Sequence, residues 1–550
     1  MNNETFIEND SKRSFFINTN ESMNVNNEEL NHTQDKIFTL ADNTRTINDN
    51  EIQSSVNMNV NNDKKSNEKY YKGTLDGFMN QVPLSFYTAI VFLLFAILIM
   101  VDGGEMTVIS LLVTKLGASW KLTNFEKGIM GSSVFIGFFA GTLFSGKMSD
   151  ISGRKPMFVV GNFIVSIFAI ASAFSPNYIW FTVFRGFCGL GIGLSLPASS
   201  ALSTEICPAQ YRGFLINLLA IFFPLGEIIT ALIAKSVLND KENGWRVLLA
   251  IIAAPMIFAL IISIFIRESP RFLANNREFN RAYLEIDRLL DGNVVLSDID
   301  KFNIKQEIIL MSENNEIESS YLSLFNKKYL CLSLSVSFIL FTCSFIYYGV
   351  VYILPEGLEK NFHHSHFSSN STMSSYSNST SLIESSKPSN IEDGIQNNTD
   401  LSKVFNGIIY SALSEIPAPL FSMLLVNIKI LGRRYSLAIS LIIVVVFSLL
   451  CAQFNSSLTV FASLLKFGIN IPFSIAYLYI SEVFPTKIRS IAIGFTNSFT
   501  RIGGIITPVV SQWLFEFKPF APYLLFSVVS GLASLCAFTL QIETYGKILE

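Results

Sequence analysis

The chain has 550 residues, of which 50% are hydrophobic and 15% are charged, and its formal net charge is −3. Soluble domains carry about 25% charged residues, so this composition excludes an ordinary soluble protein. The small net charge says little about partners, because the charged residues are segregated along the chain.

The first 82 residues are rich in Asn, Glu, Asp, Ser and Lys. Such segments cannot bury enough apolar surface to fold, so we expect residues 1–82 to form a disordered cytoplasmic tail. The tail lacks the apolar stretch of a cleaved signal peptide, and targeting is expected to depend on the first membrane helix.

Apolar segments follow, each close to the ~20 residues that a helix needs to cross a ~30 Å hydrocarbon core. Six are expected at 84–112, 126–146, 156–175, 178–202, 213–238 and 246–266, and six at 330–354, 404–426, 435–453, 458–481, 490–514 and 522–541. We predict an all-α integral membrane protein whose twelve transmembrane helices form two six-helix bundles, 83–266 and 330–541. Residues 267–329 would be a cytoplasmic linker and 542–550 a cytoplasmic tail.

Basic residues gather on one side of these segments, in the linker and at Arg154, Lys155, Arg433 and Arg434. Positively charged loops are retained in the cytoplasm, so this side and both termini are predicted to be cytoplasmic. The loop between the first two spans, on the other side, carries Lys115, Lys121 and Lys127, which are fewer than the basic residues of the cytoplasmic side. We expect a multi-pass protein of the plasma membrane or of an endomembrane vesicle.

The polar segment 359–400 is predicted to be a flexible loop on the non-cytoplasmic side. It contains three N-x-[ST] sequences, at Asn370, Asn378 and Asn397, which we expect to be glycosylated. The histidines of the same segment are interpreted as solvated loop residues, with a metal or pH-sensing role as the alternative.

No pattern typical of catalysis or metal binding is present in the sequence. The six cysteines fall in or at the ends of apolar segments, and no CxxC, HExxH or P-loop motif occurs. We therefore expect a protein that is not an enzyme, has no cofactor or metal, and binds no nucleic acid.

Short motifs recur in the two halves of the chain. The polar stretch from Gly146 to Lys155 (GKMSDISGRK) has a degenerate copy at Leu431-Gly432-Arg433-Arg434. Glu205-x-x-Pro208-x-x-x-Arg212 recurs as Glu482-x-x-Pro485-x-x-x-Arg489, and the segment around Glu268 is echoed around Glu543. The nearly constant separation indicates pseudo-symmetric halves related by an axis along the membrane normal.

The repeated motifs predict a cytoplasmic gate. Proline ends a helix in each Glu-x-x-Pro-x-x-x-Arg element, so its glutamate and arginine can reach the loop of Asp150 and Arg154 and latch it. The predicted gate residues are Gly146, Asp150, Gly153, Arg154, Glu205, Arg212, Gly432, Arg433, Glu482 and Arg489.

The stretch from Gly146 to Lys155 resembles the signature loop of the major facilitator superfamily. The segments 100–106, 185–193, 347–349, 414–417 and 500–508 are similar to the branch related to synaptic vesicle glycoprotein two. The sugar-porter branch shares Arg185 and Glu268-Ser269-Pro270-Arg271, but 344–349 lacks its glutamine-rich pattern. Lys429 in place of the loop aspartate and Ile542 in place of a proline are departures that would weaken the second-half gate. The resemblance implies solute transport through a cavity between the bundles.

Charges at membrane depth cost about 2.5–3.5 kcal/mol each on insertion scales, so each needs a partner or a function. We predict that Asp102, with Glu105 on the same helix face, pairs with Arg185, and that Glu415 pairs with Arg501. Protonation of the acid in each pair would free the arginine and couple transport to protons. A permanent structural ion pair is the alternative.

The candidate substrate-cavity residues are Glu227, Tyr347, Tyr348, Lys466 and Phe495. For Glu227 the alternative is that it extends to the membrane interface. We expect a monomeric, proton-coupled secondary transporter of a small organic solute or ion, working by alternating access. The alternatives are a sugar/proton symporter of the same fold, or a transport-inactive membrane glycoprotein.

Overall fold

The computed structural model describes residues 85–207, 211, 215, 218–238, 243–290, 301, 304–305, 324–374, 390–428, 431–454, 457–484 and 486–544. For 327–328, 361–374, 390–401, 486–487 and 490 it describes the backbone alone. All these residues belong to one compact unit, Lys72–Glu550. The predicted tail at 1–82 lies outside the described residues. Asn378 and the side chains of Asn370 and Asn397 do so too, and glycosylation stays a prediction.

The first half of the unit contains the six expected membrane helices. They are α4 (Phe86–Ser119), α5 (Asn124–Ser152), α6 (Arg154–Ala173), α7 (Tyr178–Ile206), α9 (Phe222–Val237) and α10 (Gly244–Phe265). Side chains define several of their starts. Thr123 and Glu126 form a capping box at the beginning of α5, and Asn177 accepts a hydrogen bond from the N–H of Trp180 at the beginning of α7.

The second half contains α14 (Lys327–Ser374), α15 (Asn390–Leu413), α16 (Ala418–Val426), α17 (Gly432–Gln453), α18 (Leu458–Val483), α19 (Thr486–Phe517) and α20 (Ala521–Thr539). Together α15 and α16 occupy the expected eighth span. They are separated by a turn at Ser414–Pro417, where the proline cannot continue the hydrogen-bond ladder of α15. This break places Glu415 in the middle of a discontinuous membrane helix.

Eleven helical segments among the described residues are long and apolar enough to cross a membrane. The remaining expected span, 490–514, lies in α19, which has 32 residues. Polar residues such as Asn497, Arg501 and Gln512 lower the hydropathy of α19. The described part of the chain is therefore consistent with the predicted twelve helices.

The two long connections contain helical segments. The linker contains two short helices, α11 (Pro270–Asn275) and α12 (Phe279–Leu289), whose apolar residues pack into the core of the first half. Helix α14 continues to Ser374 and α15 begins at Asn390, so both extend into the expected loop 359–400. Helical backbone thus replaces much of the predicted flexible loop.

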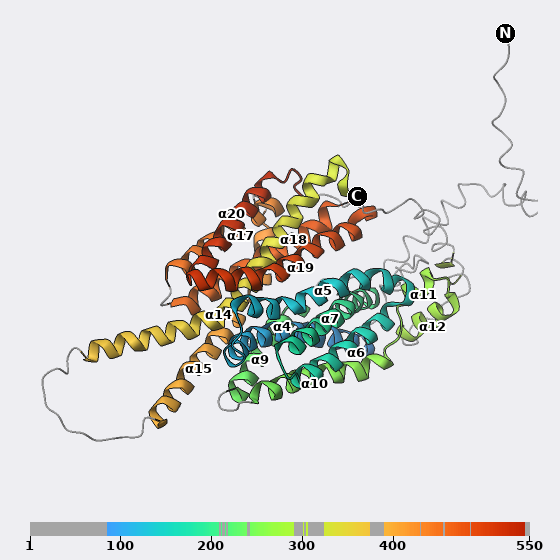
Figure 1. The fold of residues 1–550 in the computed structure, drawn as a ribbon. Coiled ribbons are helices and arrows are strands. Elements are labelled where there is room, and N and C mark those ends of the chain that lie inside the picture. Colours follow the sequence, from blue (N-terminus) through green and yellow to red (C-terminus); the bar gives the residue numbers. More distant parts are fainter. Residues whose placement is uncertain are drawn as a thin grey trace, which may run out of the picture. The chain divides into compact units, whose positions relative to one another are not determined.

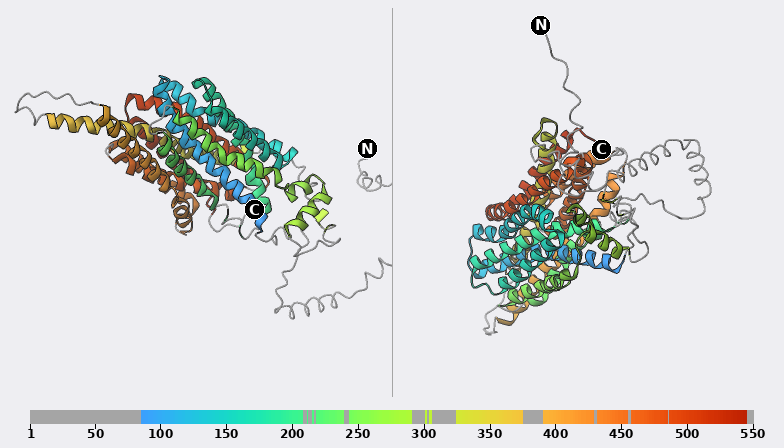
Figure 2. Two further views of the ribbon diagram at one scale, coloured as in Figure 1. Left: turned by 90° about the horizontal axis from the view of Figure 1, so that it is seen from below. Right: turned by 90° about the vertical axis from the view of Figure 1, so that its right-hand side faces the viewer.

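The two halves form two bundles that lie side by side, with α4–α10 in blue to green and α14–α20 in yellow to red (Figure 1). The further views agree with this arrangement (Figure 2). Contacts between the halves join α5 to α19, α9 to α15 and α4 to α14. A substrate path between bundles would therefore be bounded by these helices.

Glycines allow α4 and α9 to approach closely inside the first half. A Cβ added to Gly226 would lie 1.8 Å from the carbonyl oxygen of Met100, and one added to Gly103 would lie 2.2 Å from that of Phe223. Contacts this short exclude any side chain at either position. The close packing brings Glu105 and Glu227 into the centre of the protein on neighbouring helices.

We call the end that carries Gly153 and Gly432 the motif end, and the other end the far end. Among the described residues, hydrogen bonds between the halves lie at the membrane centre or toward the far end. Ser110 donates to the carbonyl of Val351 (2.6 Å), Ser132 to that of Ile505 (2.6 Å), and Lys235 to Asn406 (2.9 Å). These contacts close the path between the bundles at the far end.

Candidate functional site

A charged cluster joins the two halves at the membrane centre. Lys466 of α18 places its Nζ 2.6 Å from Oε2 of Glu227 in α9, and also pairs with Glu415 at the helix break. The Tyr347 hydroxyl lies 3.0 Å from Glu227 Oε1 and 3.0 Å from Glu415 Oε2, so it can donate its proton to either carboxylate. Asn470, one turn after Lys466, donates to Glu415 Oε2 (3.1 Å). We call these five residues the central cluster.

The central cluster is largely removed from solvent. Relative exposure is 1% for Glu227, 2% for Lys466 and 5% for Glu415. Two carboxylates face one ammonium, so the formal charge is −1 when all three are ionised. An unbalanced charge is costly at this depth, and the cluster is therefore the place where a proton or a cationic ligand would be most strongly stabilised.

A cavity of about 230 Å³ lies on the motif-end side of the cluster. Both halves line it, with Phe223 and Pro224 from the first half and Tyr348, Glu415 and Phe473 from the second. A second, much smaller cavity lies on the far side and is lined by Ser110, Glu227 and Lys466, among others. The cluster therefore separates two spaces, and its members face different ends of the protein.

The predicted pairing of Asp102 with Arg185 is wrong. Arg185 pairs with Glu105, and both side chains are at most 2% exposed. Asp102 interacts electrostatically with Arg501 of the other half, and its Oδ1 has no hydrogen-bond partner among the described residues. Asp102 and Glu105 are three positions apart on α4, and Arg185 lies at the depth of Glu105.

The predicted pairing of Glu415 with Arg501 is also wrong. Glu415 pairs with Lys466, while the guanidinium of Arg501 lies 3.6 Å from the ring centroid of Phe138 in α5. The sequence argument assumed one acid–base pair inside each half. Glu105–Arg185 stays within the first half and Glu415–Lys466 within the second. The contacts of Arg501 with Asp102 and Phe138, and the second contact of Lys466, with Glu227, cross between the halves. Relative motion of the halves would therefore change the surroundings of these charges.

The motif end of the first half is held by a carboxylate at a helix N-terminus. Glu268 accepts hydrogen bonds from the N–H groups of Arg154 (3.1 Å) and Lys155 (3.2 Å) at the start of α6, where the helix dipole favours an anion. Partial burial raises the pKa of Glu268, and these backbone donors act against the rise. The Arg154 side chain contacts Asp150 (3.0 Å) and Glu205 (3.4 Å).

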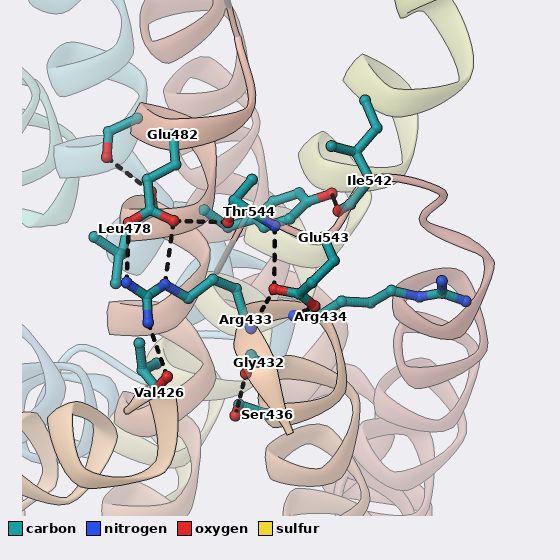
Figure 3. Close-up of polar contacts among 12 residues, drawn as sticks. Val426, Gly432, Arg433, Arg434, Ser436, Leu478, Glu482, Ile542, Glu543 and Thr544 are labelled. Carbon is teal, nitrogen blue, oxygen red and sulfur yellow. Dashed lines mark hydrogen bonds and ion pairs between the residues drawn. The ribbon is translucent and has the colours of Figure 1, made fainter. Parts of the chain in front are cut away.

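The second half repeats this arrangement (Figure 3). Glu543 accepts from the N–H groups of Arg433 (2.8 Å) and Arg434 (3.1 Å), and the Arg433 guanidinium contacts Glu482 (3.1 Å). Ile542 stands where the family resemblance implies a proline, and this departure leaves the contact of Glu543 intact. Lys429 lies outside the described residues. The motif residues thus bind one another within each half.

Other predicted site residues are placed as follows. Arg212 lies outside the described residues. Its counterpart Arg489 donates to the carbonyl of Phe484 (3.2 Å) and so binds within its own motif, not at the Arg433 loop. Phe495 packs against Phe325 (5.6 Å between ring centroids) and is not among the described residues that line the larger cavity. Glu227 is buried, which rules out the interfacial position.

Three residues that contribute contacts to these sites were not predicted as site residues from the sequence. Asn470 lies four residues after Lys466 in an apolar segment, and this i, i+4 spacing of two polar residues was an available signal. Glu268 and Glu543 were recognised as a repeat, but not as the groups that cap α6 and α17.

Replacing Gly153 by alanine should destabilise the motif end. Gly153 has φ of 108° and ψ of 162°, a conformation almost restricted to glycine, and an added Cβ would lie 2.2 Å from Oε2 of Glu268. We expect a loss of about 1–3 kcal/mol of stability, measured as a lower unfolding midpoint in detergent. Gly146→Ala is the matched control, because the added Cβ would meet no atom within 4 Å beyond the neighbouring backbone of its own helix. Equal midpoints for the two variants would contradict this assignment.

Comparison with known proteins agrees with the fold. Residues 43–365 match the family model described as sugar (and other) transporter, and residues 338–548 match that of the major facilitator superfamily. Synaptic vesicle 2-related protein of Xenopus laevis is 30% identical over 457 residues, covering 82% of this chain and 77% of that protein. Niacin transporter NiaP of Acinetobacter baylyi is 27% identical over 455 residues, covering 82% and 93%.

Solved structures show the same architecture. The inward open conformation of the xylose transporter XylE from E. coli matches with a TM-score of 0.61 at 16% identity, covering 84% of this chain and 98% of that one. A crystal structure of D-xylose-proton symporter matches with a TM-score of 0.60 at 17% identity, covering 84% and 100%. At such identities the likeness concerns the fold alone. The family predicted from the motifs is confirmed, and the chain belongs to the sugar (and other) transporter family of the major facilitator superfamily.

Proposed function

We propose that the protein is a proton-coupled secondary active transporter that moves a small organic solute or ion through the cavity between its halves. The observation that carries this proposal is the central cluster. It joins Glu227 of one half to Lys466 and Glu415 of the other, beside a cavity lined by both. A purely structural membrane protein has no need of an unbalanced charge cluster in its core.

Alternating access supplies the transport step. The halves are joined by hydrogen bonds at the far end, and the larger cavity lies toward the motif end. The positive charges near Arg154 and Arg433 favour a cytoplasmic motif end, so this conformation would receive or release solute on the cytoplasmic side. Motion of the halves about the cluster would then open the far end.

Coupling to protons requires acids whose partners change during that motion. Asp102 lies near Arg501 across the interface, and Glu415 shares Lys466 with Glu227 across the same interface. Separating the halves would withdraw the positive partner from at least one acid, which favours binding of a proton. Glu105 and Arg185 belong to one half, and we assign them a structural role.

Uptake into proteoliposomes tests the proposal. The purified full chain is reconstituted, a pH gradient is imposed, and a panel of labelled organic cations, organic anions and sugars is offered. We expect accumulation of at least one solute that collapses when an uncoupler removes the gradient. Accumulation that ignores the gradient would contradict proton coupling. Absence of uptake for the whole panel in correctly folded protein would favour a transport-inactive membrane glycoprotein.

A further inference from the structure

The larger cavity carries a single kind of charge on its wall. Among the described residues that line it, Glu415 is the one with a formal charge. Lys466 lies behind Glu415 and is not part of this lining, because its ammonium is directed between Glu415 and Glu227. A solute in the cavity therefore meets a carboxylate and no described cation.

The positive charge available to the central cluster is already shared. Lys466 contacts both carboxylates, and Glu415 Oε1 faces the ammonium without a well-oriented hydrogen bond. The nearby Asp102 and Arg501 have opposite charges and cancel each other. With both carboxylates and the ammonium ionised, one negative charge thus stays unbalanced, and a bound monocation would neutralise it.

Aromatic rings form much of the remaining wall. Tyr347 and Tyr348 meet edge to face with centroids 5.3 Å apart, and Phe223 lies 6.0 Å from Tyr347. Phe473 lines the cavity from α18. Rings around a carboxylate attract organic cations through their π faces, and they attract anions poorly. A volume of about 230 Å³ suits a compact molecule.

From this charge pattern we infer that the transported solute is a small organic monocation whose positive group binds at Glu415 among these rings. This inference rests on the proposed transport function and adds the substrate class. A carboxylate solute would meet the Glu415 charge without a described cation in the cavity wall. A sugar would leave the unbalanced charge in place.

Four ligands of similar size separate the possibilities. We would measure thermal unfolding of the detergent-solubilised full chain at neutral pH with 1-methylnicotinamide, a cation, nicotinamide, which is neutral, nicotinate, an anion, and D-xylose. Tetraethylammonium serves as a second, non-aromatic cation. We expect the cations to raise the unfolding midpoint in a concentration-dependent manner, and the other ligands to leave it unchanged.

Glu415→Gln is the diagnostic variant. It leaves Glu227 balanced by Lys466, so the protein should fold, and the apparent affinity for the cations should fall about tenfold or more. Glu356→Gln is the matched control, because Glu356 pairs with Lys360 at the far end of α14. If Glu415→Gln does not fold, Phe473→Leu tests the same site by removing a cavity ring, with a severalfold loss expected.

The outcomes distinguish this inference from the proposed function. A midpoint raised by nicotinate or D-xylose and by neither cation would overturn the substrate class while leaving transport intact. No effect of either cation, or an equal effect in wild type and Glu415→Gln, would also overturn it. Cation binding without uptake of labelled 1-methylnicotinamide into proteoliposomes would instead support the site and contradict transport.

Discussion

Replacing Lys466 by methionine should severely reduce the amount of folded protein. Lys466 is 2% exposed and contacts both Glu227 and Glu415. Its loss leaves two carboxylates without their shared cation, and breaking a buried ion pair in this way costs about 3–5 kcal/mol. That is a large fraction of the ~5–15 kcal/mol that stabilises a typical protein. Detergent-extracted, monodisperse protein measured by fluorescence-detected gel filtration checks this.

A second substitution should rescue this variant. Lys466→Met with Glu227→Gln restores the wild-type formal charge of the cluster, so folded protein should recover even though two contacts are missing. Lys360→Met is the control, because Lys360 is 49% exposed in its pair with Glu356 and should change stability by no more than about 1 kcal/mol. A Lys466→Met protein as abundant as wild type would show that the cluster charges are not coupled. If the double variant also fails to fold, the loss of folded protein in Lys466→Met is due to packing and not to the unbalanced charge.

The prediction of the fold from sequence worked because it depended on hydropathy and on repeated motifs. A membrane helix requires a long apolar segment, and the spans around Leu98 or Ile252 show this directly. The repeat of Gly153-Arg154 as Gly432-Arg433 located equivalent helix ends in the two halves, and the structure gives both ends the same contacts. Local signals were sufficient for these features.

The partners of the buried charges could not be predicted in the same way. Depth in the membrane follows from position along a helix, but the direction of a side chain depends on helix rotation and tilt. Asp102 and Glu105 differ by three residues, and only packing decides which one meets Arg185. The break before Pro417 was also not predicted, and it allows Glu415 to reach Lys466. A prediction that treats each half separately cannot identify contacts between the halves.

The end of the seventh helix, expected at residue 354, was misjudged for a different reason. Composition indicated a polar, flexible segment after the seventh apolar span, and polar composition was taken to end the helix there. Backbone hydrogen bonds of a helix do not require apolar side chains once the helix has been nucleated, so α14 can continue beyond the membrane to Ser374. Hydropathy therefore located the apolar part of this helix but not the end of the helix.

Glu105→Gln should prevent folding and Asp102→Asn should not, although the two acids lie one turn apart on α4. Glu105 is the ion-pair partner of Arg185, which is 1% exposed, so its neutralisation leaves a buried guanidinium unpaired. We expect a cost of about 3–5 kcal/mol and little folded protein at the membrane. Asp102 already has an oxygen without a hydrogen-bond partner among the described residues, and its neighbour Arg501 retains the Phe138 ring. Asp102→Asn should therefore fold to near-normal levels.

The functional consequence of Asp102→Asn completes the test. Asparagine mimics a protonated aspartate, so solute exchange between the two sides should continue, while accumulation driven by a pH gradient should be lost. Surface abundance, counterflow exchange and gradient-driven uptake are measured on the same preparation. Retained accumulation in Asp102→Asn would contradict its proton role and leave Glu415 as the acid to test next. Normal folding of Glu105→Gln would contradict the structural role of its pair with Arg185, since a permanent buried pair cannot lose one partner without cost.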